Sequence, residues 1–357
     1  MKYILTEFYE KFYCIGDKCS DTCCGGWRIG VDENTYQVYM GLEEPYRSEI
    51  CNNIKQNRNG QYEIIKDKAG RCPFLNEKNL CNIYLKVSPD ALSQTCKTYP
   101  RKIINYYDVI MATVSITCPV VTRMVLEQKE PIEFDYIEDE NQNIMDKANG
   151  ILFNELINGL VVSLDILQIR EFSLSQRFFL LFLLTDEIQS FVDKKEIVSM
   201  RTTVDKYRFH EYRQMILDKY YDLISFQQER WFFISSIFTY IDKRFSLNDV
   251  DLRNYIEKCS LIPDKDEEKY RIWNEKFNQL DLDIEYENLA VQLVFECYMD
   301  ALNGKSLYVN LIKLLLLLIM IRTQQLLSYN VDEKLSKEDR ISIISKMSRS
   351  MAHSSAS

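Results

Sequence analysis

Hydrophobic residues beyond residue 150 recur at the three- and four-residue spacing of amphipathic helices. Strong helix breakers are rare in this part of the chain and comprise only Gly159, Pro263 and Gly304. The pattern therefore predicts a long series of helices in the C-terminal part.

Two helix starts can be placed from their capping residues. The segment 173–176, Ser-Leu-Ser-Gln, matches a capping box and precedes the apolar run 178–184. The segment 336–339, Ser-Lys-Glu-Asp, precedes Ile341 and its apolar neighbours, which predicts a last amphipathic helix.

The N-terminal part is divided by turn-forming residues. Seven of the ten glycines lie at or before Gly70, and six of the seven prolines lie at or before Pro131. Such spacing predicts irregular backbone with short elements, including strands near 27–31 and 109–114. Strands and helices do not alternate, so a doubly wound sheet is not expected.

A charged segment at 127–131, followed by the acidic residues 138–140, is typical of a domain boundary. We expect residues 1–130 to form a loop-rich cysteine-cluster domain with short strands. Residues 131–347 should form an all-helical domain, and the small polar residues 348–357 a disordered tail. The expected fold class is mainly α.

Charge and hydropathy argue against two classes of binding partner, nucleic acids and membranes. The formal net charge of −9 and the lack of a basic cluster argue against a nucleic-acid binder. The first residues lack the apolar core of a signal peptide. No uninterrupted run reaches the ~18 apolar residues of a membrane span, and the nearest, 314–321, is expected to be a buried helix. We therefore expect a cytoplasmic protein with no membrane partner.

Cysteine is the chemically distinctive residue of this chain. There are eleven cysteines and two histidines, and His210 and His353 lie far along the sequence from the cysteine-rich part. Cys51, Cys259 and Cys297 are expected to be core or half-buried residues. The expected metal ligands are Cys14, Cys19, Cys23, Cys24, Cys72, Cys81, Cys96 and Cys118.

Clustered cysteines in a reducing compartment favour a metal site over disulfides. Thiolates select zinc or an iron–sulfur cluster, and the long, irregular separations favour iron–sulfur, with zinc as the alternative. Eight thiolates could serve two four-cysteine sites, or four could hold one cluster while the others pack nearby. The adjacent pair Cys23-Cys24 favours the second arrangement. The three-cysteine spacing common in radical enzymes that cleave S-adenosylmethionine is absent, because Gly26 stands at its third position.

Several sequence blocks between residues 8 and 125 resemble the flagellin lysine N-methylase family, whose N-terminal part is related to zinc- or iron-chelating cysteine domains. The blocks are Phe12-Tyr13-Cys14 through Cys19, Asp21-Thr22-Cys23-Cys24, Gly26-Trp27-Arg28-Ile29, Gly70-Arg71-Cys72-Pro73-Phe74-Leu75-Asn76, Leu80-Cys81-Asn82-Ile83-Tyr84, Thr95-Cys96, Tyr99-Pro100-Arg101 and Ser115-Ile116-Thr117-Cys118-Pro119.

The resemblance implies methyl transfer from S-adenosylmethionine to lysine side chains of flagellin, with an iron–sulfur cluster, 4Fe-4S in type, bound by the cysteines. The sequence has no glycine-rich nucleotide loop after a strand, so a Rossmann-type cofactor site is not expected. One hypothesis is that the amino and carboxylate groups of the cofactor chelate an open iron of the cluster.

Lysine methylation requires a neutral amine, so the site must remove the charge of the lysine. Tyr99, Asp32 and Asp21 are candidates because they adjoin the cysteine blocks, and Arg101 could bind a carboxylate. Each also has a structural interpretation. Asp32 could cap a helix that begins near Thr35, Tyr99 could pack in the core, and Arg101 could pair on the surface.

The alternative function is a non-catalytic zinc or iron–sulfur binding module whose helical domain docks a partner. An electron-transfer protein fits less well, because it leaves more than 200 helical residues without a role.

Overall fold

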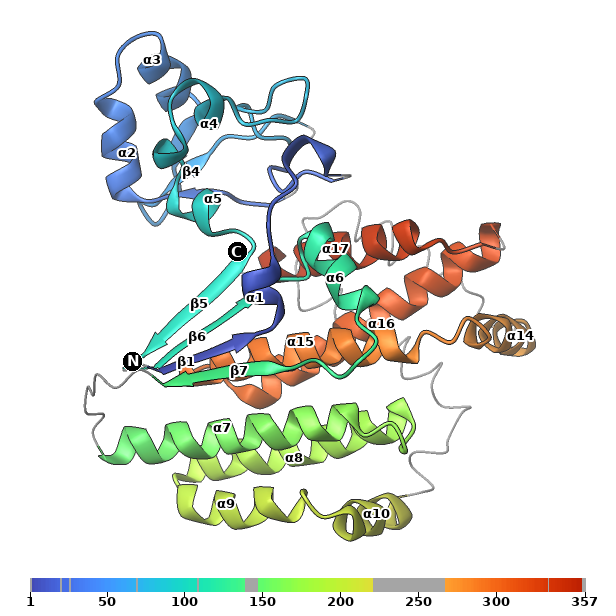
Figure 1. The fold of residues 1–357 in the computed structure, drawn as a ribbon. Coiled ribbons are helices and arrows are strands. Elements are labelled where there is room, and N and C mark those ends of the chain that lie inside the picture. Colours follow the sequence, from blue (N-terminus) through green and yellow to red (C-terminus); the bar gives the residue numbers. More distant parts are fainter. Residues whose placement is uncertain are drawn as a thin grey trace.

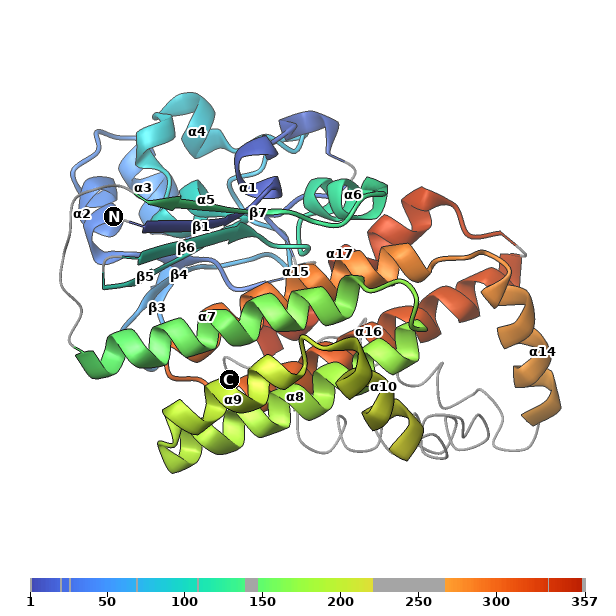
Figure 2. The ribbon, with the colours of Figure 1, turned by 60° about the horizontal axis from the view of Figure 1, so that its bottom comes forward.

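The computed structural model describes residues 2–19, 21–25, 27–68, 70–107, 109–138, 147–220, 267–332 and 334–354. These residues form a small lobe, a four-stranded sheet and a body of long helices (Figure 1). The sheet lies between the other two parts, and the long helices lie along one side of it in the second view (Figure 2).

The small lobe combines short helices with a three-stranded antiparallel sheet. The strands pair in the order β2 (Gly30–Val31), β4 (Tyr62–Ile64) and β3 (Ile54–Gln56). The helices are α2 (Glu33–Met40), α3 (Tyr46–Cys51), α4 (Asn82–Lys86) and α5 (Gln94–Thr98), together with the 3-10 helix η2 (Pro89–Ala91). The lobe has its own hydrophobic cluster, in which Tyr39, Phe74 and Ile83 are buried.

The four-stranded sheet joins the N-terminal segments to the helical body. Its order is β5 (Arg101–Tyr106), β6 (Val109–Val114), β1 (Lys2–Thr6) and β7 (Phe134–Glu138). β1 runs parallel to β6, and the other pairs are antiparallel. Helix α1 (Phe8–Lys11) follows β1, the 3-10 helix η1 (Gly16–Lys18) comes next, and α6 (Pro119–Glu127) follows β6.

The long helices form the largest part of the described chain. They are α7 (Lys147–Gln168), α8 (Leu174–Lys194), α9 (Ile197–Lys206), α10 (His210–Lys219), α14 (Glu267–Asn278), α15 (Asp283–Leu302), α16 (Leu307–Asp332) and α17 (Lys337–Ser354). Their apolar faces share one hydrophobic cluster with β1, β6 and α6.

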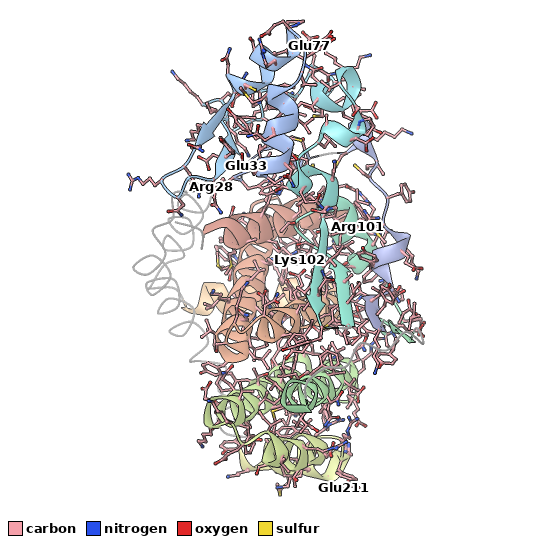
Figure 3. The ribbon with its side chains drawn as sticks, turned by 90° about the vertical axis from the view of Figure 1, so that its left-hand side faces the viewer. Arg28, Glu33, Glu77, Arg101, Lys102 and Glu211 are labelled. Carbon is pink, nitrogen blue, oxygen red and sulfur yellow. The ribbon has the colours of Figure 1, made fainter. Side chains whose placement is uncertain are left out.

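Helix α15 is buried even at polar positions, because its polar side chains bind neighbouring elements. The Gln292 side chain donates to the Thr113 hydroxyl at 2.6 Å and to the Val114 carbonyl at 2.7 Å, at the end of β6. The Lys102 side chain on β5 pairs with Glu296. Figure 3 shows Lys102 and Arg101 on β5, between the lobe and the helices. α15 therefore fixes the sheet to the helical body.

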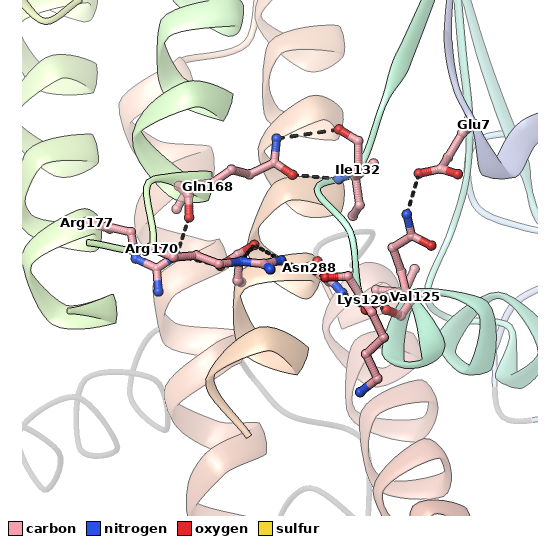
Figure 4. Close-up of polar contacts among 11 residues, drawn as sticks. Glu7, Val125, Lys129, Ile132, Gln168, Arg170, Arg177 and Asn288 are labelled. Atoms are coloured by element: carbon pink, nitrogen blue, oxygen red, sulfur yellow. Dashed lines mark hydrogen bonds and ion pairs between the residues drawn. The ribbon is translucent and has the colours of Figure 1, made fainter. Parts of the chain in front are cut away.

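A second set of polar contacts fixes α15 to α8, to the loop between α7 and α8, and to α6 (Figure 4). The carboxylate of Glu287, which is 1% exposed, accepts hydrogen bonds from Arg170 at 2.9 Å and from Arg177 at 2.6 Å. The Asn288 side chain donates to the carbonyls of Val125 at 3.1 Å and Gln128 at 2.8 Å. These bonds satisfy groups whose burial would otherwise be costly.

The expected fold class is confirmed: the described chain is mainly α, with the short strands in its N-terminal region. β2 and β6 lie in the two segments expected to be strands. The capping box is present as expected, because the Ser173 hydroxyl accepts from the Gln176 amide and the Gln176 side chain accepts from the Ser173 amide.

The expectation of a disordered tail from residue 348 is wrong for the part that the structure describes. α17 continues to Ser354, and Ser348 and Arg349 are buried. The spacing of Ile341, Ile344 and Met347 continues through this segment, so the helix keeps a face to bury although its composition becomes polar. The strand β7 was also not expected, because it lies past residue 130 and extends the sheet along β1.

Two described helical segments, Gly150–Gln168 and Leu307–Asn330, are long and apolar enough to span a membrane by length and composition. Polar and charged residues interrupt both segments, so neither contains an uninterrupted apolar run of that length. In each segment 56% of the apolar window is buried inside the protein. Core helices pass the same test, so this finding is only weak evidence for a membrane span.

Candidate metal centre

The eight cysteines expected to bind metal come from loops and short helices of the lobe and from the residue that precedes α6. All eight are free thiols. Cys14, Cys19, Cys23 and Cys24 lie on the segment between α1 and β2, and Cys72, Cys81 and Cys96 belong to the rest of the lobe. Cys118 directly precedes α6 in the helical part of the molecule.

Four thiols gather in the core of the lobe, and we call them the lobe set: Cys24, Cys72, Cys81 and Cys96. The Cys72 amide donates to the Cys24 carbonyl at 2.9 Å, and a β-bridge joins Leu75 to Cys81. All four belong to the same hydrophobic cluster of the lobe.

The pKa values of the lobe set reflect burial and mutual proximity. Burial, together with the charges that Cys24, Cys81 and Cys96 would carry, raises the pKa of the Cys72 thiol to about 12. Burial likewise raises the pKa of Cys96 to about 11, with contributions from Cys24 and Cys81. The four thiols are thus close enough to influence one another, and a bound cation would favour their deprotonation together.

The remaining four thiols lie where the lobe meets the helical body, and we call them the junction set: Cys14, Cys19, Cys23 and Cys118. Burial raises the pKa of Cys118 to about 11, and the charges of Cys19 and Cys14 add to the effect. The pKa of Cys19 is also raised by burial and by Cys14. Cys14 is exposed, so this set is open to solvent on one side.

The two sets meet at the adjacent pair Cys23-Cys24. The hydrogen bond between these two thiols raises the pKa of Cys23 and lowers that of Cys24. Lys66 and Arg71 also lower the pKa of Cys24. The indole N–H of Trp27 donates to the Cys23 carbonyl at 2.6 Å, which fixes the peptide unit between the two cysteines.

Arg349 on α17 holds the junction together, and sequence reasoning missed it because it lies in the segment expected to be disordered. Its guanidinium pairs with the Asp21 carboxylate at 2.6 Å. It also donates to the carbonyls of Thr22 at 3.2 Å and Thr117 at 3.3 Å. The apolar spacing of α17 was the signal that could have placed it.

Within the described chain, no three histidine, cysteine, aspartate or glutamate side chains are close enough to hold a single metal ion. The chemistry of the donors nevertheless fits a thiolate-bound group, because each set consists of four free, soft ligands. A cluster also separates its four thiolates more widely than one ion does, since each thiolate binds a different iron.

The candidates for proton transfer are all engaged in structural contacts. Asp32 caps α2 by accepting from the Thr35 amide at 3.0 Å, and it also accepts from the Gln94 amide at 2.9 Å. Asp21 pairs with Arg349. The Tyr99 hydroxyl donates to the Thr117 hydroxyl at 3.1 Å, and burial raises the pKa of this phenol.

Arg101 orients the N-terminal segment. Its guanidinium donates to the Phe12 carbonyl at 3.0 Å and lies over the rings of Phe12 and Tyr9, at 5.0 and 5.6 Å from their centroids. Arg101 makes these contacts in place of the surface ion pair that was its structural interpretation. They position the chain just before Cys14.

The cysteines outside the two sets are placed largely as expected. Cys51 is half-buried at the edge of the lobe core, and Cys297 is buried on α15. Cys259 lies outside the described residues. His210 contacts Glu171 at 2.9 Å and stacks on Phe172 in the helical body, which agrees with its expected separation from the cysteines.

A cavity of about 470 Å³ that is largely open to solvent lies on the surface of the lobe, near the lobe set. Lys66 connects the two, because it lines the cavity and its charge interacts with Cys72 and Cys24. Glu63 is buried in the wall and pairs with Arg28 and Lys55, each at 3.1 Å. The lining residues are Trp27, Arg28, Lys55, Glu63, Ile64, Ile65, Lys66 and Gly70.

Comparison with curated proteins gives three relatives that share part of this chain. The flagellar biosynthetic protein FliU of Salmonella muenchen is 32% identical over 128 residues, which cover 34% of this chain and 76% of that protein. Lysine-N-methylases of Salmonella typhimurium and Salmonella choleraesuis are each 31% identical over 128 residues. These alignments cover 34% of this chain but only 32% of each lysine-N-methylase. No solved structure matches the chain.

The family model described as the FliB lysine N-methylase C-terminal domain matches residues 161–357. This match lies in the helical body, whereas the resemblance seen in the sequence rests on cysteine blocks before residue 125. Because the matched domain covers more than half of the chain, the protein belongs to the FliB lysine N-methylase family.

Proposed function

We propose that this protein transfers methyl groups from S-adenosylmethionine to lysine side chains of flagellin in the cytoplasm, with an iron–sulfur cluster bound by its N-terminal cysteines. Family membership and the names of the relatives support methyl transfer to lysine and a flagellar target. The observation that carries the proposal is Arg349, which joins the family's C-terminal domain to the loop of Cys23 and Cys24. This contact supports a site to which both the cysteine loop and the helical body contribute.

The junction set supplies the thiolates for the proposed cluster. When bound, such a cluster offers iron that can accept ligands besides cysteine. Cys14, the exposed member, lies on the side open to a substrate. Asp21, Asp32 and Tyr99 are engaged elsewhere, so we infer that the substrate lysine loses its proton through desolvation in the site, which lowers the pKa of an amine.

The cavity beside Cys24 is our proposed place for S-adenosylmethionine. This cofactor combines an adenine ring and a sulfonium with an ammonium and a carboxylate, and the cavity lies in the volume range of small-molecule sites. In the structure Lys66 donates to the Trp27 carbonyl and Arg28 pairs with Glu63, and these two cations would exchange those partners for the carboxylate of the cofactor. Trp27 offers an aromatic ring.

Replacing Lys66 tests this placement. The Lys66→Met variant should bind S-adenosylmethionine about tenfold more weakly, because it loses one charge-assisted hydrogen bond. Equilibrium dialysis with labelled cofactor measures the affinity. Lys68→Met is the matched control, since Lys68 is exposed and does not line the cavity. Equal affinities in the two variants would remove the cavity from the proposal.

The activity itself is tested by incubating anaerobically purified protein with unlabelled S-adenosylmethionine and flagellin. Peptide mass spectrometry should show that flagellin lysines gain about 14 daltons for each methyl group that replaces a proton. Flagellin whose lysines have been chemically dimethylated serves as the control substrate. If flagellin gains no methyl group while the metal remains bound, the protein is instead a non-catalytic metal-binding module.

A further inference from the structure

Trp27 lies where the cavity of the lobe meets the loop of Cys23 and Cys24. It lines the cavity, and its indole N–H donates to the Cys23 carbonyl at 2.6 Å. Its own carbonyl accepts from Lys66, whose ammonium also lies 6.0 Å from the centroid of the indole ring. One residue therefore contacts both the proposed cofactor cavity and the backbone between the two adjacent cysteines.

The peptide unit between Cys23 and Cys24 is held at both of its polar ends. Its carbonyl accepts from the Trp27 indole, and its N–H, which belongs to Cys24, donates to the Thr22 hydroxyl at 3.2 Å. Because a peptide unit is planar, its orientation sets the backbone angles on both sides, ψ of Cys23 and φ of Cys24. Trp27 and Thr22 together thus position the two cysteines relative to each other.

The indole ring is also held from the side of the helical body. It stacks on the ring of Tyr99, which packs against the body core, with 5.4 Å between the centroids and 29° between the planes. The Tyr99 hydroxyl donates to the Thr117 hydroxyl at 3.1 Å, and the Thr117 carbonyl accepts from Arg349 of α17 at 3.3 Å. The orientation of the indole therefore depends on the lobe, through Lys66, and on the body, through Tyr99.

Cofactor binding makes these contacts more important. When the carboxylate of the cofactor takes Lys66 as its partner, the Trp27 carbonyl loses that donor. The hydrogen bond to Cys23 and the stack on Tyr99 still hold the residue in place. The indole thus keeps the cysteine loop fixed against an occupied cavity.

We infer that Trp27 is a positioning residue for methyl transfer, whose ring forms a wall for the cofactor and whose indole N–H holds the Cys23 peptide in the orientation that the reaction uses. The inference rests on the proposed function, because it takes the cofactor to occupy the cavity and the cysteines to bind metal. Trp27 acts through the backbone of Cys23 and not on a reacting atom. Its ring and its N–H are different groups, so their two roles can be separated.

Three full-length variants separate these roles. Trp27→Phe keeps an aromatic ring against Tyr99 but lacks the N–H, and Trp27→Leu lacks both. Thr22→Val removes the hydroxyl at the other end of the peptide unit, and Thr22 does not line the cavity. Trp273→Phe is the control, because Trp273 packs in a separate hydrophobic cluster of the helical body.

The proteins are purified anaerobically, and three quantities are measured: the affinity for labelled S-adenosylmethionine by equilibrium dialysis, the single-turnover rate of methyl transfer to flagellin, and the deuterium uptake of the peptide containing Cys23 and Cys24. Trp27→Phe and Thr22→Val should keep the affinity within about twofold of the wild type. Both should slow methyl transfer and accelerate deuterium uptake about tenfold, as the loss of one hydrogen bond predicts. Trp27→Leu should also bind the cofactor about tenfold more weakly, and Trp273→Phe should match the wild type.

Wild-type deuterium uptake in Trp27→Phe and Thr22→Val would overturn the inference, and so would wild-type rates of methyl transfer at saturating cofactor, since Trp27 would then be only a wall of the cavity. Circular dichroism checks that each variant is folded. Thr22→Val leaves the aromatic stack intact and carries the test if a Trp27 variant unfolds. If the wild type transfers no methyl group, the proposed function fails, and deuterium uptake alone decides whether Trp27 positions the cysteines.

Discussion

Asp32 shows how a polar residue beside a cysteine block serves the fold of the lobe. Its carboxylate accepts from the Thr35 amide at the start of α2 and from the Gln94 amide at the start of α5. Burial alone would raise the pKa of this carboxyl, but the two amide hydrogen bonds outweigh burial and hold the pKa below its ordinary value. The ionised form is therefore the one that stabilises the lobe.

The Asp32→Ala variant should lower the free energy of unfolding by about 1 kcal/mol at neutral pH, as loss of a helix cap does. Because the folded pKa is depressed, this stabilisation is present above the ordinary aspartate pKa of ~4 and is lost as the pH falls through the folded pKa. Urea unfolding followed by tryptophan fluorescence from pH 7 to pH 3 measures it. The exposed Asp90→Ala is the control, and a difference that persists unchanged in acid contradicts the assignment.

Arg349 is the residue on which the junction depends most. Its side chain is 8% exposed and binds one carboxylate and two carbonyls. The Arg349→Met variant leaves these acceptors without a partner, which should cost about 3 kcal/mol. We expect a lower melting temperature and loss of metal from the junction set. Lys346→Met on the exposed face of α17 is the control. Retention of all metal in Arg349→Met would show that Arg349 does not organise the junction.

At the scale of elements, local signals predicted helices well. The serine and glutamine of the capping box at Ser173 and Gln176 bond each other's amides, as their spacing requires. The helix after Ser336 was also expected, but its end was not. Polar residues near Ser348 suggested disorder, because composition does not show that α17 packs against α6 and α16. This segment is helical because tertiary contacts bury one of its faces.

The candidate site could also be predicted only in part, because tertiary contacts determine how its residues come together. Sequence spacing identified the eight thiols but not their division into sets, since that depends on the β-bridge of Leu75 with Cys81 and on the bond of Cys72 with Cys24. The structural interpretation of Asp32 followed from its position before Thr35. The contact of Arg349 with Asp21 spans most of the chain, and no local pattern predicts it.

Helix α15 offers a test of how elements are held together. Glu287 is 1% exposed and lies between Arg170 and Arg177. The Glu287→Gln variant removes the charge and leaves both guanidinium groups poorly paired. The free energy of unfolding should therefore fall by about 3 to 5 kcal/mol. Thermal unfolding followed by circular dichroism measures the loss. Glu211→Gln, an exposed position on α10, should change little. A small effect at Glu287 would mean that packing, not this ion pair, fixes α15 against α7 and α8.

At the scale of the whole molecule, two hydrophobic cores of unequal size meet at the junction. Among the described residues, nine are buried in the lobe core, whereas the body core extends over the sheet and most long helices. A small core contributes little net stability, because the entropy cost of ordering the chain nearly cancels it. The lobe should therefore depend on bound metal for its stability, and the helical body should not.

Metal removal should consequently act on one part of the molecule. After anaerobic chelation, amides in the lobe, such as those of β4 and α2, should exchange with deuterium roughly 10-fold faster or more, as expected when about 1.4 kcal/mol or more of local stability is lost. Amides in α7, α15 and α16 should keep their protection, because Cys118 is the one residue of the two cysteine sets in the large described core that they share. Hydrogen exchange read by mass spectrometry resolves the two parts, and reloading with metal should restore the lobe. Faster exchange throughout the molecule would mean that both cores unfold as one unit. Unchanged exchange in the lobe would mean that its thiols stabilise it without metal.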